Sequence, residues 1–294
     1  MRHPEYDAFL EEDWFFEALT ETYIPIIRVL DGLVRDGVEY RLTMTLSPPL
    51  VSMMTDELLI GRYRRNLDRL VDLALRETER TKREQPHLEE MAWWYVRELE
   101  DVRRLFRDDW GSNVVSAFRR HLDSGRLEVL TCAATHGFLP LMDAVPEAVR
   151  AQIHVGAQHY RKHFDRDPAG IWLPECAYMP GHEVFLREAG LRFSFLEAHG
   201  LTEAHPQPSF GVHAPLVSPG GIVFFGRDME SSRQVWSSES GYPGDFDYRE
   251  FYKDIGWELP WDDLAAFLPD GQRKNLGIKY HRVSGRGVDL AHKQ

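Results

Sequence analysis

The sequence predicts an α/β fold built on a parallel sheet. Short apolar segments alternate along the chain with longer segments of helical periodicity. Three of the short segments, 127–132, 170–173 and 193–196, are rich in apolar residues, as expected of strands that are buried on both faces. The 294 residues include 43% hydrophobic ones, which is enough to build the core of one large domain or of one barrel with an insertion.

The first third of the chain is predicted to be mainly helical. Apolar residues fall at helical spacing over 14–33, and a strand is expected over 40–46, where it ends at Ser47-Pro48-Pro49. A block of helical character, roughly 53–124, follows with a break at Gly111-Ser112-Asn113. This block is too long for one crossover helix, so we predict that it is a helical insertion.

The remaining elements alternate between strand and helix. Helices are expected over 146–164 and 181–189, between the three apolar strands. Strands at 212–217 and 222–225 flank Ser218-Pro219-Gly220-Gly221 like a hairpin. The last expected elements are two short helices and a strand, at 231–236, 248–255 and 277–283.

Charge and composition exclude several classes of protein. The formal net charge is −12, and the basic residues are mixed with acids, so a nucleic acid is not expected as a partner. No apolar run reaches the length of a membrane span, and the first residues lack the apolar segment of a signal peptide. Two cysteines, Cys132 and Cys176, make neither a disulfide framework nor a closed zinc site, so a cytoplasmic setting is expected.

Two strand ends carry side chains that could act in binding or catalysis. His136 follows the strand 127–132 just before a glycine, where it could bind a substrate hydroxyl, orient a carboxylate, or be a core histidine held by the backbone. Glu175 follows the strand 170–173 between Trp172 and Tyr178. A carboxylate is costly to bury without partners, so this one is either a nucleophile or half of a structural salt bridge.

Two further segments have a possible binding role. Residues 226–251 mix charges, glycines and aromatics without amphipathic order, which is typical of a binding loop. Aromatic residues gather in and just after it: Trp236, Tyr242, Tyr248 and Trp257. His159 and His163 lie four apart on an expected helix and share a face, which suits either a metal ligand pair or a solvated helix surface.

Together these segments resemble glycoside hydrolase family 57, in particular its 1,4-α-glucan branching enzymes. Arg2-His3-Pro4-Glu5, followed by the helix around Trp14, resembles the family's opening. Residues 128–141 resemble its second signature, and 170–178 resemble the third, which carries the nucleophile. Residues 227–248 resemble the substrate loop of the branching subgroup. The likeness covers nearly the whole chain.

The resemblance implies a (β/α)7 barrel with a helical insertion and a retaining mechanism without metal or organic cofactor. It implies that Glu175 forms the glycosyl-enzyme intermediate and that His136 lines the donor site. The substrate it implies is an α-1,4-glucan, with neither nucleic acid nor membrane as a partner. The candidate substrate-binding residues, from the resemblance and the aromatic pattern together, are His136, Trp14, Trp172, Arg249, Tyr242, Trp257 and Gly277.

The chain departs from the family pattern at both ends. The family's opening strand with its His-x-His pair is expected before Arg2, and its acid/base aspartate and C-terminal helical domain are expected beyond residue 294. We therefore expect 1–294 to be a partial catalytic barrel, incomplete at both ends. As given, without the C-terminal portion of its own chain, it is expected to be inactive or nearly so.

Three alternatives remain at this level. An α-amylase or a 4-α-glucanotransferase of the same family differs from a branching enzyme only in the acceptor. A catalytically dead glycan-binding protein would keep the aromatic residues without a working carboxylate pair. A metal-dependent deacetylase on a similar barrel is suggested by His159 and His163.

Overall fold

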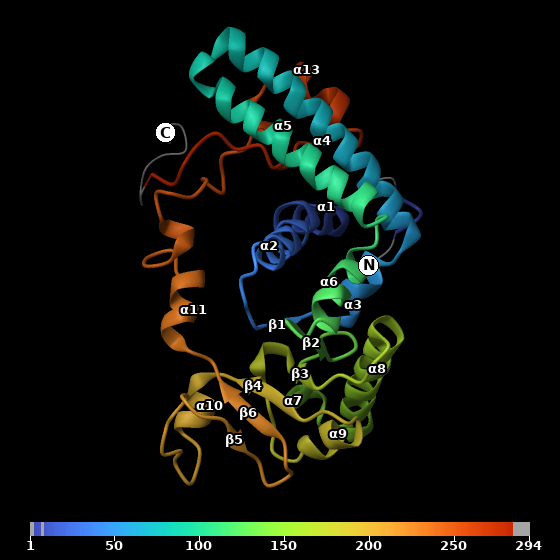
Figure 1. Cartoon of the computed structure of the whole chain (residues 1–294), viewed down its shortest axis with the longest axis vertical. Helices are drawn as coiled ribbons and strands as arrows, with labels where there is room; N and C mark the ends of the chain where they lie inside the picture. The colour runs from blue at the N-terminus through green and yellow to red at the C-terminus, as the bar shows by residue number, and fades with distance from the viewer. Residues whose placement is uncertain (1–2, 7–8, 285–294) are drawn as a thin grey trace. The chain divides into compact units, whose positions relative to one another are not determined.

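The structure is a computed structural model that describes residues 3–6 and 9–284 (Figure 1). The chain divides into two compact units that interleave in sequence. The helical unit comprises Met1–Val29, Asp56–Val114 and Arg233–Gln294, and the sheet unit comprises Leu30–Thr55 and Val115–Ser232. Across the described ranges, no helix combines the length and the apolar character that a bilayer crossing requires.

The sheet unit contains a six-stranded sheet in the order β1-β2-β3-β4-β6-β5. Neighbouring strands from β1 to β6 pair in parallel, and β5 pairs with β6 in an antiparallel hairpin. The predicted α/β fold with a parallel sheet is confirmed, as is the hairpin. The strands are β1 (Leu42–Thr45), β2 (Leu127–Cys132), β3 (Gly170–Trp172), β4 (Phe193–Leu196), β5 (Leu216–Val217) and β6 (Val223–Gly226).

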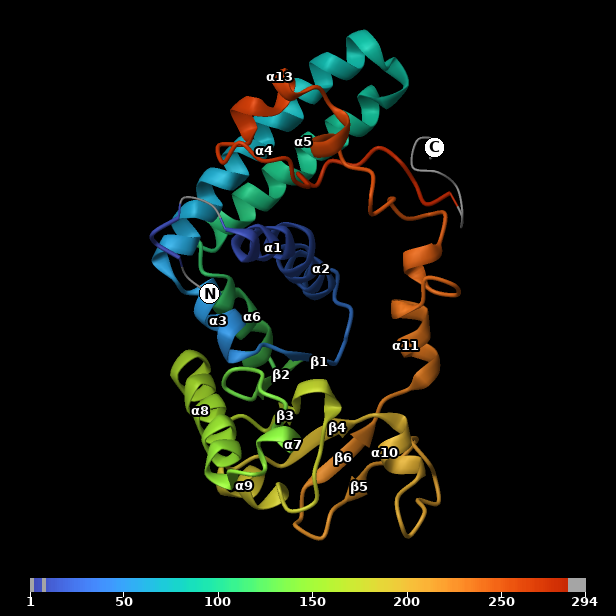
Figure 2. The same ribbon diagram turned by 180° about the vertical axis from the view of Figure 1, so that it is seen from behind.

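Helices of the same unit pack on this sheet around an apolar core (Figure 2). They are α7 (Leu139–Met142), α8 (Pro146–Phe164), α9 (Glu183–Glu188) and α10 (Ala198–Thr202), and α3 (Pro48–Met54) contacts α8. Proline at the first turn of α8 suits a helix start, and Asp165 in the left-handed conformation follows its end. Val149, Ile153 and Ala157 recur at helical spacing on its buried face.

The helical unit begins with α1 (Leu10–Ala18) and a π-helical turn at Leu19–Tyr23. The chain continues in α2 (Ile24–Arg35), which passes into the sheet unit. A hairpin of two long helices, α4 (Glu57–Glu84) and α5 (Glu89–Arg104), occupies most of the helical block 53–124. Asp56 caps α4 by accepting a hydrogen bond from the backbone N–H of Leu59. A π-helical turn at Leu105–Asp109 precedes α6 (Val114–Asp123), which belongs to the sheet unit from its second residue onwards.

Residues 248–255 and 277–283 contradict two sequence expectations. The first segment is not a helix, and the second is not a strand; one isolated bridge pairs Arg249 with Arg282. Side chains satisfy the backbone instead: the buried Asp254 carboxylate accepts from the backbone N–H groups of Gly256, Leu276 and Gly277. The regular elements in this region are α11 (Met229–Trp236), α12 (Ile255–Glu258) and α13 (Trp261–Leu264).

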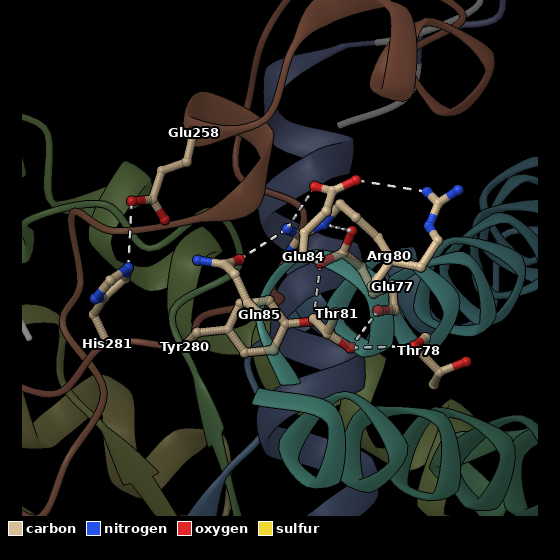
Figure 3. Close-up of polar contacts among 10 residues, drawn as sticks. Glu77, Thr78, Arg80, Thr81, Glu84, Gln85, Glu258, Tyr280 and His281 are labelled. Atoms are coloured by element: carbon tan, nitrogen blue, oxygen red, sulfur yellow. Dashed lines mark hydrogen bonds and ion pairs between the residues drawn. The ribbon is translucent and has the colours of Figure 1, made fainter. Parts of the chain in front are cut away.

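A buried ion pair ties the end of this segment to α4 (Figure 3). Arg80 donates to both carboxylate oxygens of Glu77, at 2.8 and 2.7 Å, and the Tyr280 hydroxyl donates to Glu77 at 3.0 Å. The neighbouring His281 lies 3.4 Å from the Glu258 carboxylate. The contact between Tyr280 and Glu77, which are 203 residues apart in sequence, thus holds the irregular segment 277–283 against α4.

Candidate active site

His136 lies in a tight turn directly after β2. Its φ of 58° is in the left-handed region, which residues other than glycine rarely adopt. Its backbone N–H donates to the carbonyl of Ala133 at 3.0 Å. Gln152 of α8 holds the turn from the side, because its side chain bonds both the backbone N–H and the hydroxyl of Thr135.

Glu175 lies in a similar turn after β3. Glu175 and Cys176 have φ values of 58° and 53°, so two consecutive residues are left-handed without being glycine. Such conformations cost free energy and cluster at active sites and ligand clamps. The turn is closed by a hydrogen bond from the Cys176 N–H to the carbonyl of Leu173 at 2.9 Å.

The two turns meet at one edge of the parallel sheet. β2 and β3 are neighbours with Cys132 opposite Trp172, so the segments that follow them leave the sheet side by side. His136 Nε2 lies 3.5 Å from Glu175 Oε1. The structure therefore brings together the two side chains that the sequence singled out at separate strand ends, a distance of 39 residues along the chain.

The sequence argument that Glu175 is a buried carboxylate between Trp172 and Tyr178 is wrong. The Glu175 side chain is 72% exposed and that of His136 is 46% exposed. Tyr178 turns into the core instead, where its ring lies 4.7 Å from that of Phe224 and its hydroxyl donates to Glu183. The Glu175 carboxylate is thus open to solvent, where a large substrate can reach it.

Other strands carry polar side chains at the same sheet edge. Glu197 follows β4, Arg227 follows β6, and the two form an ion pair. Burial raises the pKa of the Cys176 thiol, and the Glu197 carboxylate adds to this rise. Sequence reasoning missed this pair, although each member is the first polar residue after a short strand. Trp172, a predicted site residue, lies within 6.3 Å of Phe195 on β4, centroid to centroid.

Four other predicted residues come together in a pocket of the helical unit with a volume of about 550 Å³. They are Trp14, Arg249, Trp257 and Gly277, which line the pocket with others such as Trp94 and Tyr95. The residues Trp14 and Trp257 are 60% and 55% exposed. The Trp257 indole N–H donates to Asn275 at 2.8 Å, which fixes its ring while leaving its faces accessible.

Arg249 is anchored in this pocket by three acceptors. It donates to Glu21 at 2.6 Å and to the Tyr95 hydroxyl and the Gly277 carbonyl at 3.3 Å each. Burial alone would lower the pKa of Arg249, but the Glu21 carboxylate and Tyr95 outweigh it and raise that pKa. Gly277 has a φ of 82°, and a Cβ there would lie 2.9 Å from the Glu21 carboxylate, so glycine permits this ion pair.

A nearby carboxyl in the same pocket has a perturbed acidity. Burial raises the pKa of Glu17, and the charge of Glu21 adds to the rise. Tyr242, also predicted to bind substrate, does not line the pocket; its ring lies 5.3 Å from that of Tyr248. The predicted residues thus fall into two groups, one in each unit, with Tyr242 in a separate aromatic contact.

His159 and His163 lie against each other on α8. Their ring centroids are 4.4 Å apart, and His159 Nε2 lies 3.0 Å from the Ser52 hydroxyl. Burial lowers both pKa values, that of His159 to about 4. In the part of the chain that the structure describes, no group of three or more His, Cys, Asp or Glu side chains is placed to hold a metal ion.

Comparisons with known proteins agree on one family. The model of "Glycosyl hydrolase family 57" matches residues 1–286. A 1,4-alpha-glucan branching enzyme of Thermococcus kodakarensis is 34% identical over 96% of this chain and 42% of its own length. A probable 1,4-alpha-glucan branching enzyme of Mycobacterium tuberculosis is 27% identical over 96% of this chain and 51% of its own. The chain spans about half the length of these relatives.

Solved structures give the same result. The alpha-amylase AmyC of Thermotoga maritima superposes with a TM-score of 0.95 at 43% identity, over 100% of this chain and 56% of its own. A GH57-type branching enzyme of Pyrococcus horikoshii gives 0.81 at 32% identity, over 96% and 50%. Because the family model spans nearly the whole chain and the branching enzyme of Thermococcus kodakarensis is 34% identical over 96% of it, the chain belongs to glycosyl hydrolase family 57.

Proposed function

We propose that this chain supplies the nucleophile of a retaining enzyme that acts on α-1,4-glucans, with Glu175 as that nucleophile. The observation that carries the proposal is the placement of Glu175 Oε1 at 3.5 Å from His136 Nε2, in two left-handed turns at neighbouring strand ends. Family membership supports a glycosidase or transglycosylase chemistry at this edge. His136 orients the carboxylate from one side, while the other side stays open to a sugar.

The reaction consists of two displacements at one carbon atom. A Glu175 oxygen bonds to the anomeric carbon as the glycosidic C–O bond breaks, and the leaving oxygen takes a proton from a general acid. An acceptor hydroxyl then attacks the same carbon, gives its proton to the now deprotonated general acid, and displaces Glu175 as a free carboxylate. Two inversions leave the anomeric configuration unchanged.

The pocket of the helical unit supports a sugar polymer as substrate. Trp14 and Trp257 offer exposed indole faces, on which the C–H faces of glucose rings can stack. Arg249 and Glu21 offer charged hydrogen-bonding groups in the same pocket. Trp172 and Tyr242 are proposed as further contacts to the chain of glucose units.

The acceptor determines which enzyme of the family this is. We favour branching, in which a glucan 6-hydroxyl accepts the transferred chain, because the curated relatives are branching enzymes. Hydrolysis is the second candidate, supported by the TM-score of 0.95 with an alpha-amylase. Disproportionation by a 4-α-glucanotransferase differs only in that a 4-hydroxyl accepts. Exclusion of water by residues 226–244 would favour both transfers over hydrolysis.

The cellular setting and the domain organisation of the chain are proposed as well. The two cysteines are free, which is consistent with a reducing, cytoplasmic setting. The helical block 53–124 is proposed as an insertion in the (β/α)7 barrel, the architecture of the family.

The nucleophile is tested with an activated donor such as 5-fluoro-α-D-glucosyl fluoride. Fluoride leaves without protonation, so the label attaches to Glu175 whether or not a general acid assists. Intact mass spectrometry of the purified chain should show one added glycosyl group, and peptide mapping should place it on Glu175. The Glu175→Gln variant should stay unlabelled. A label on another residue, or none on the wild type, would refute the assignment.

Amylose then separates the alternatives. Branching lowers iodine staining without new reducing ends and yields products that a debranching enzyme cleaves. Hydrolysis raises reducing ends, and disproportionation redistributes chain lengths without debranchable products. Amylose binding without labelling or turnover would favour a non-catalytic glycan-binding protein. Zinc in the purified protein together with deacetylase activity would favour the deacetylase alternative.

A further inference from the structure

The imidazole of His136 lies between a thiol and a carboxylate. Its Nε2 atom faces Glu175 Oε1 at 3.5 Å, and its Nδ1 atom lies 3.2 Å from the Sγ atom of Cys132. Cys132 is the last residue of β2 and is fully buried, while His136 follows it by four residues. The left-handed turn at His136 folds the ring back towards the strand from which the chain has just emerged.

We propose that Cys132 is a positioning residue that sets the tautomer of His136: its thiol donates to Nδ1, so that the ring proton resides on Nε2 and points at the Glu175 carboxylate. This inference rests on the proposed function of Glu175 and adds a third residue to that site. Cys132 itself does not touch the substrate in this scheme.

The protonation state of the Cys132 sulfur favours a hydrogen bond from the thiol to Nδ1 of His136. Burial raises the pKa of the Cys132 thiol to about 12, and the Glu175 charge adds to the rise, so the sulfur keeps its proton at neutral pH. A thiol is a weak donor and a weak acceptor, so the lone pair of an imidazole nitrogen is the better acceptor in this contact. A neutral imidazole has one donor and one acceptor nitrogen, and the partner of one fixes the role of the other.

The opposite tautomer would leave an unfavourable contact. With the proton on Nδ1, the lone pair of Nε2 would face the lone pairs of Glu175 across 3.5 Å. With the proton on Nε2, the same contact is an N–H aimed at a carboxylate, which is a charge-assisted interaction. The thiol on Nδ1 and the carboxylate on Nε2 therefore favour the same tautomer, in which Nε2–H is the donor that orients Glu175.

The packing around Cys132 protects this arrangement. The backbone of α8 at Gly156 lies directly against the Cys132 carbonyl. A Cβ atom added to Gly156 would be only 2.2 Å from that carbonyl oxygen. Thr131 adds a hydrogen bond from its hydroxyl to the Gly156 carbonyl at 2.9 Å. No sulfur oxidation or metal is required, because the role is that of a buried hydrogen-bond donor.

The tautomer is measured directly by nitrogen NMR on the purified chain labelled with 15N-histidine. The spectrum of His136→Gln identifies the His136 signals. At neutral pH the wild type should show a protonated Nε2 and an unprotonated Nδ1. Cys132→Ser should keep this pattern, because a hydroxyl also donates. Cys132→Ala should raise the fraction of the Nδ1-protonated tautomer above that of the wild type, because only the carboxylate then favours a proton on Nε2. Val129→Ala, a matched buried truncation in the same strand, should resemble the wild type.

The second readout is the rate at which the activated glucosyl fluoride labels Glu175. We expect Cys132→Ala to slow the maximal labelling rate about 2–10-fold with little change in the half-saturating concentration, as loss of one hydrogen bond between neutral groups predicts. Cys132→Ser should restore most of the rate, and Val129→Ala should not change it.

The two readouts separate two kinds of failure. A wild-type His136 that carries its proton on Nδ1, or on both nitrogens, overturns the inference even if Cys132→Ala does not fold. The inference also fails if folded Cys132→Ala labels Glu175 as fast as the wild type with an unchanged tautomer. If no variant is labelled although the tautomer pattern is as expected, the assignment of Glu175 fails while the role of the thiol on the ring stands.

Discussion

Glu175 and Glu77 show that carboxylates of one chain have opposite roles according to their surroundings. Glu175 is 72% exposed and interacts with a histidine at ion-pair distance, whereas Glu77 is buried and receives three hydrogen bonds from Arg80 and Tyr280. The exposed carboxylate contributes little to the fold and can be used for chemistry. The buried one fixes residues 277–283 to α4 and is not available for anything else.

We therefore expect the two glutamine variants to differ in stability. Glu175→Gln should leave the free energy of unfolding within about 0.5 kcal/mol of the wild type, because no buried partner is lost. Glu77→Gln should lower it by about 3–5 kcal/mol, because it leaves the Arg80 guanidinium without its buried counter-charge. Urea unfolding followed by circular dichroism measures both. Equal losses in the two variants would contradict this distinction.

His159 predicts a pH dependence of stability. Its pKa is lowered to about 4, first by burial and then by the charges of His163 and Lys162, while the unfolded value is near 6.5. Between these values the unfolded chain binds more protons, so stability rises with pH and is lost as pH falls from 6.5 towards 4. His159→Gln should therefore lose less stability than the wild type between pH 7 and pH 5, as measured by urea midpoints. A wild type that is equally stable at both pH values would refute this.

At the scale of elements, the contact between α8 and β2 positions the His136 turn. Gly156 allows it, because a Cβ there would lie 2.2 Å from the Cys132 carbonyl. Gly156→Ala should destabilise the protein by about 1–3 kcal/mol through overpacking. Gly61→Ala in α4 is the matched change, because a Cβ there meets only the Arg65 side chain at 3.9 Å. It should stabilise by about 0.5–1 kcal/mol. Urea midpoints of both variants check the signs.

α1 and α12 each contribute one tryptophan to the pocket of the helical unit. Removal of either ring, in Trp14→Ala or Trp257→Ala, should weaken the binding of maltoheptaose about 2–10-fold, given about 0.5–1.5 kcal/mol per aromatic contact. Trp93→Ala is the control, because Trp93 is exposed on α5 and does not line the pocket. Isothermal titration calorimetry gives the three affinities. An unchanged affinity in both pocket variants would move the glucan site elsewhere.

At the scale of the whole molecule, the net charge of −12 favours the binding of a neutral polymer over that of a polyanion. A nucleic acid would be repelled, whereas a glucan carries no counterions to release, so its binding should be nearly independent of salt. Electrophoresis through a gel that contains glycogen should retard the protein equally at low and moderate salt, and double-stranded DNA should not shift at either. Retardation that disappears with salt would indicate an electrostatic ligand instead.

The fold could be predicted from sequence where one local signal decided the structure. The strands 127–132 and 193–196 and the helix 146–164 occur at the predicted residues, because a short apolar run and a helical apolar stripe each have one favourable way to be buried. Family membership confirms the (β/α)7 architecture that the motifs implied. The predictions failed at 248–255 and 277–283, where Asp254 and Tyr95 satisfy the backbone from a distance.

Part of the candidate site, too, could be predicted from the sequence, and part of it could not. The sequence by itself determined the α/β fold, the family, and the two strand ends that carry His136 and Glu175, because strand, turn and polar residue are adjacent in the chain. Only the tertiary structure decided that Glu175 is exposed, that His136 lies between Cys132 and Glu175, and that Arg249 pairs with Glu21. These features depend on contacts between residues far apart in sequence or on turns with unusual φ, and neither leaves a periodic signal that residue order can reveal.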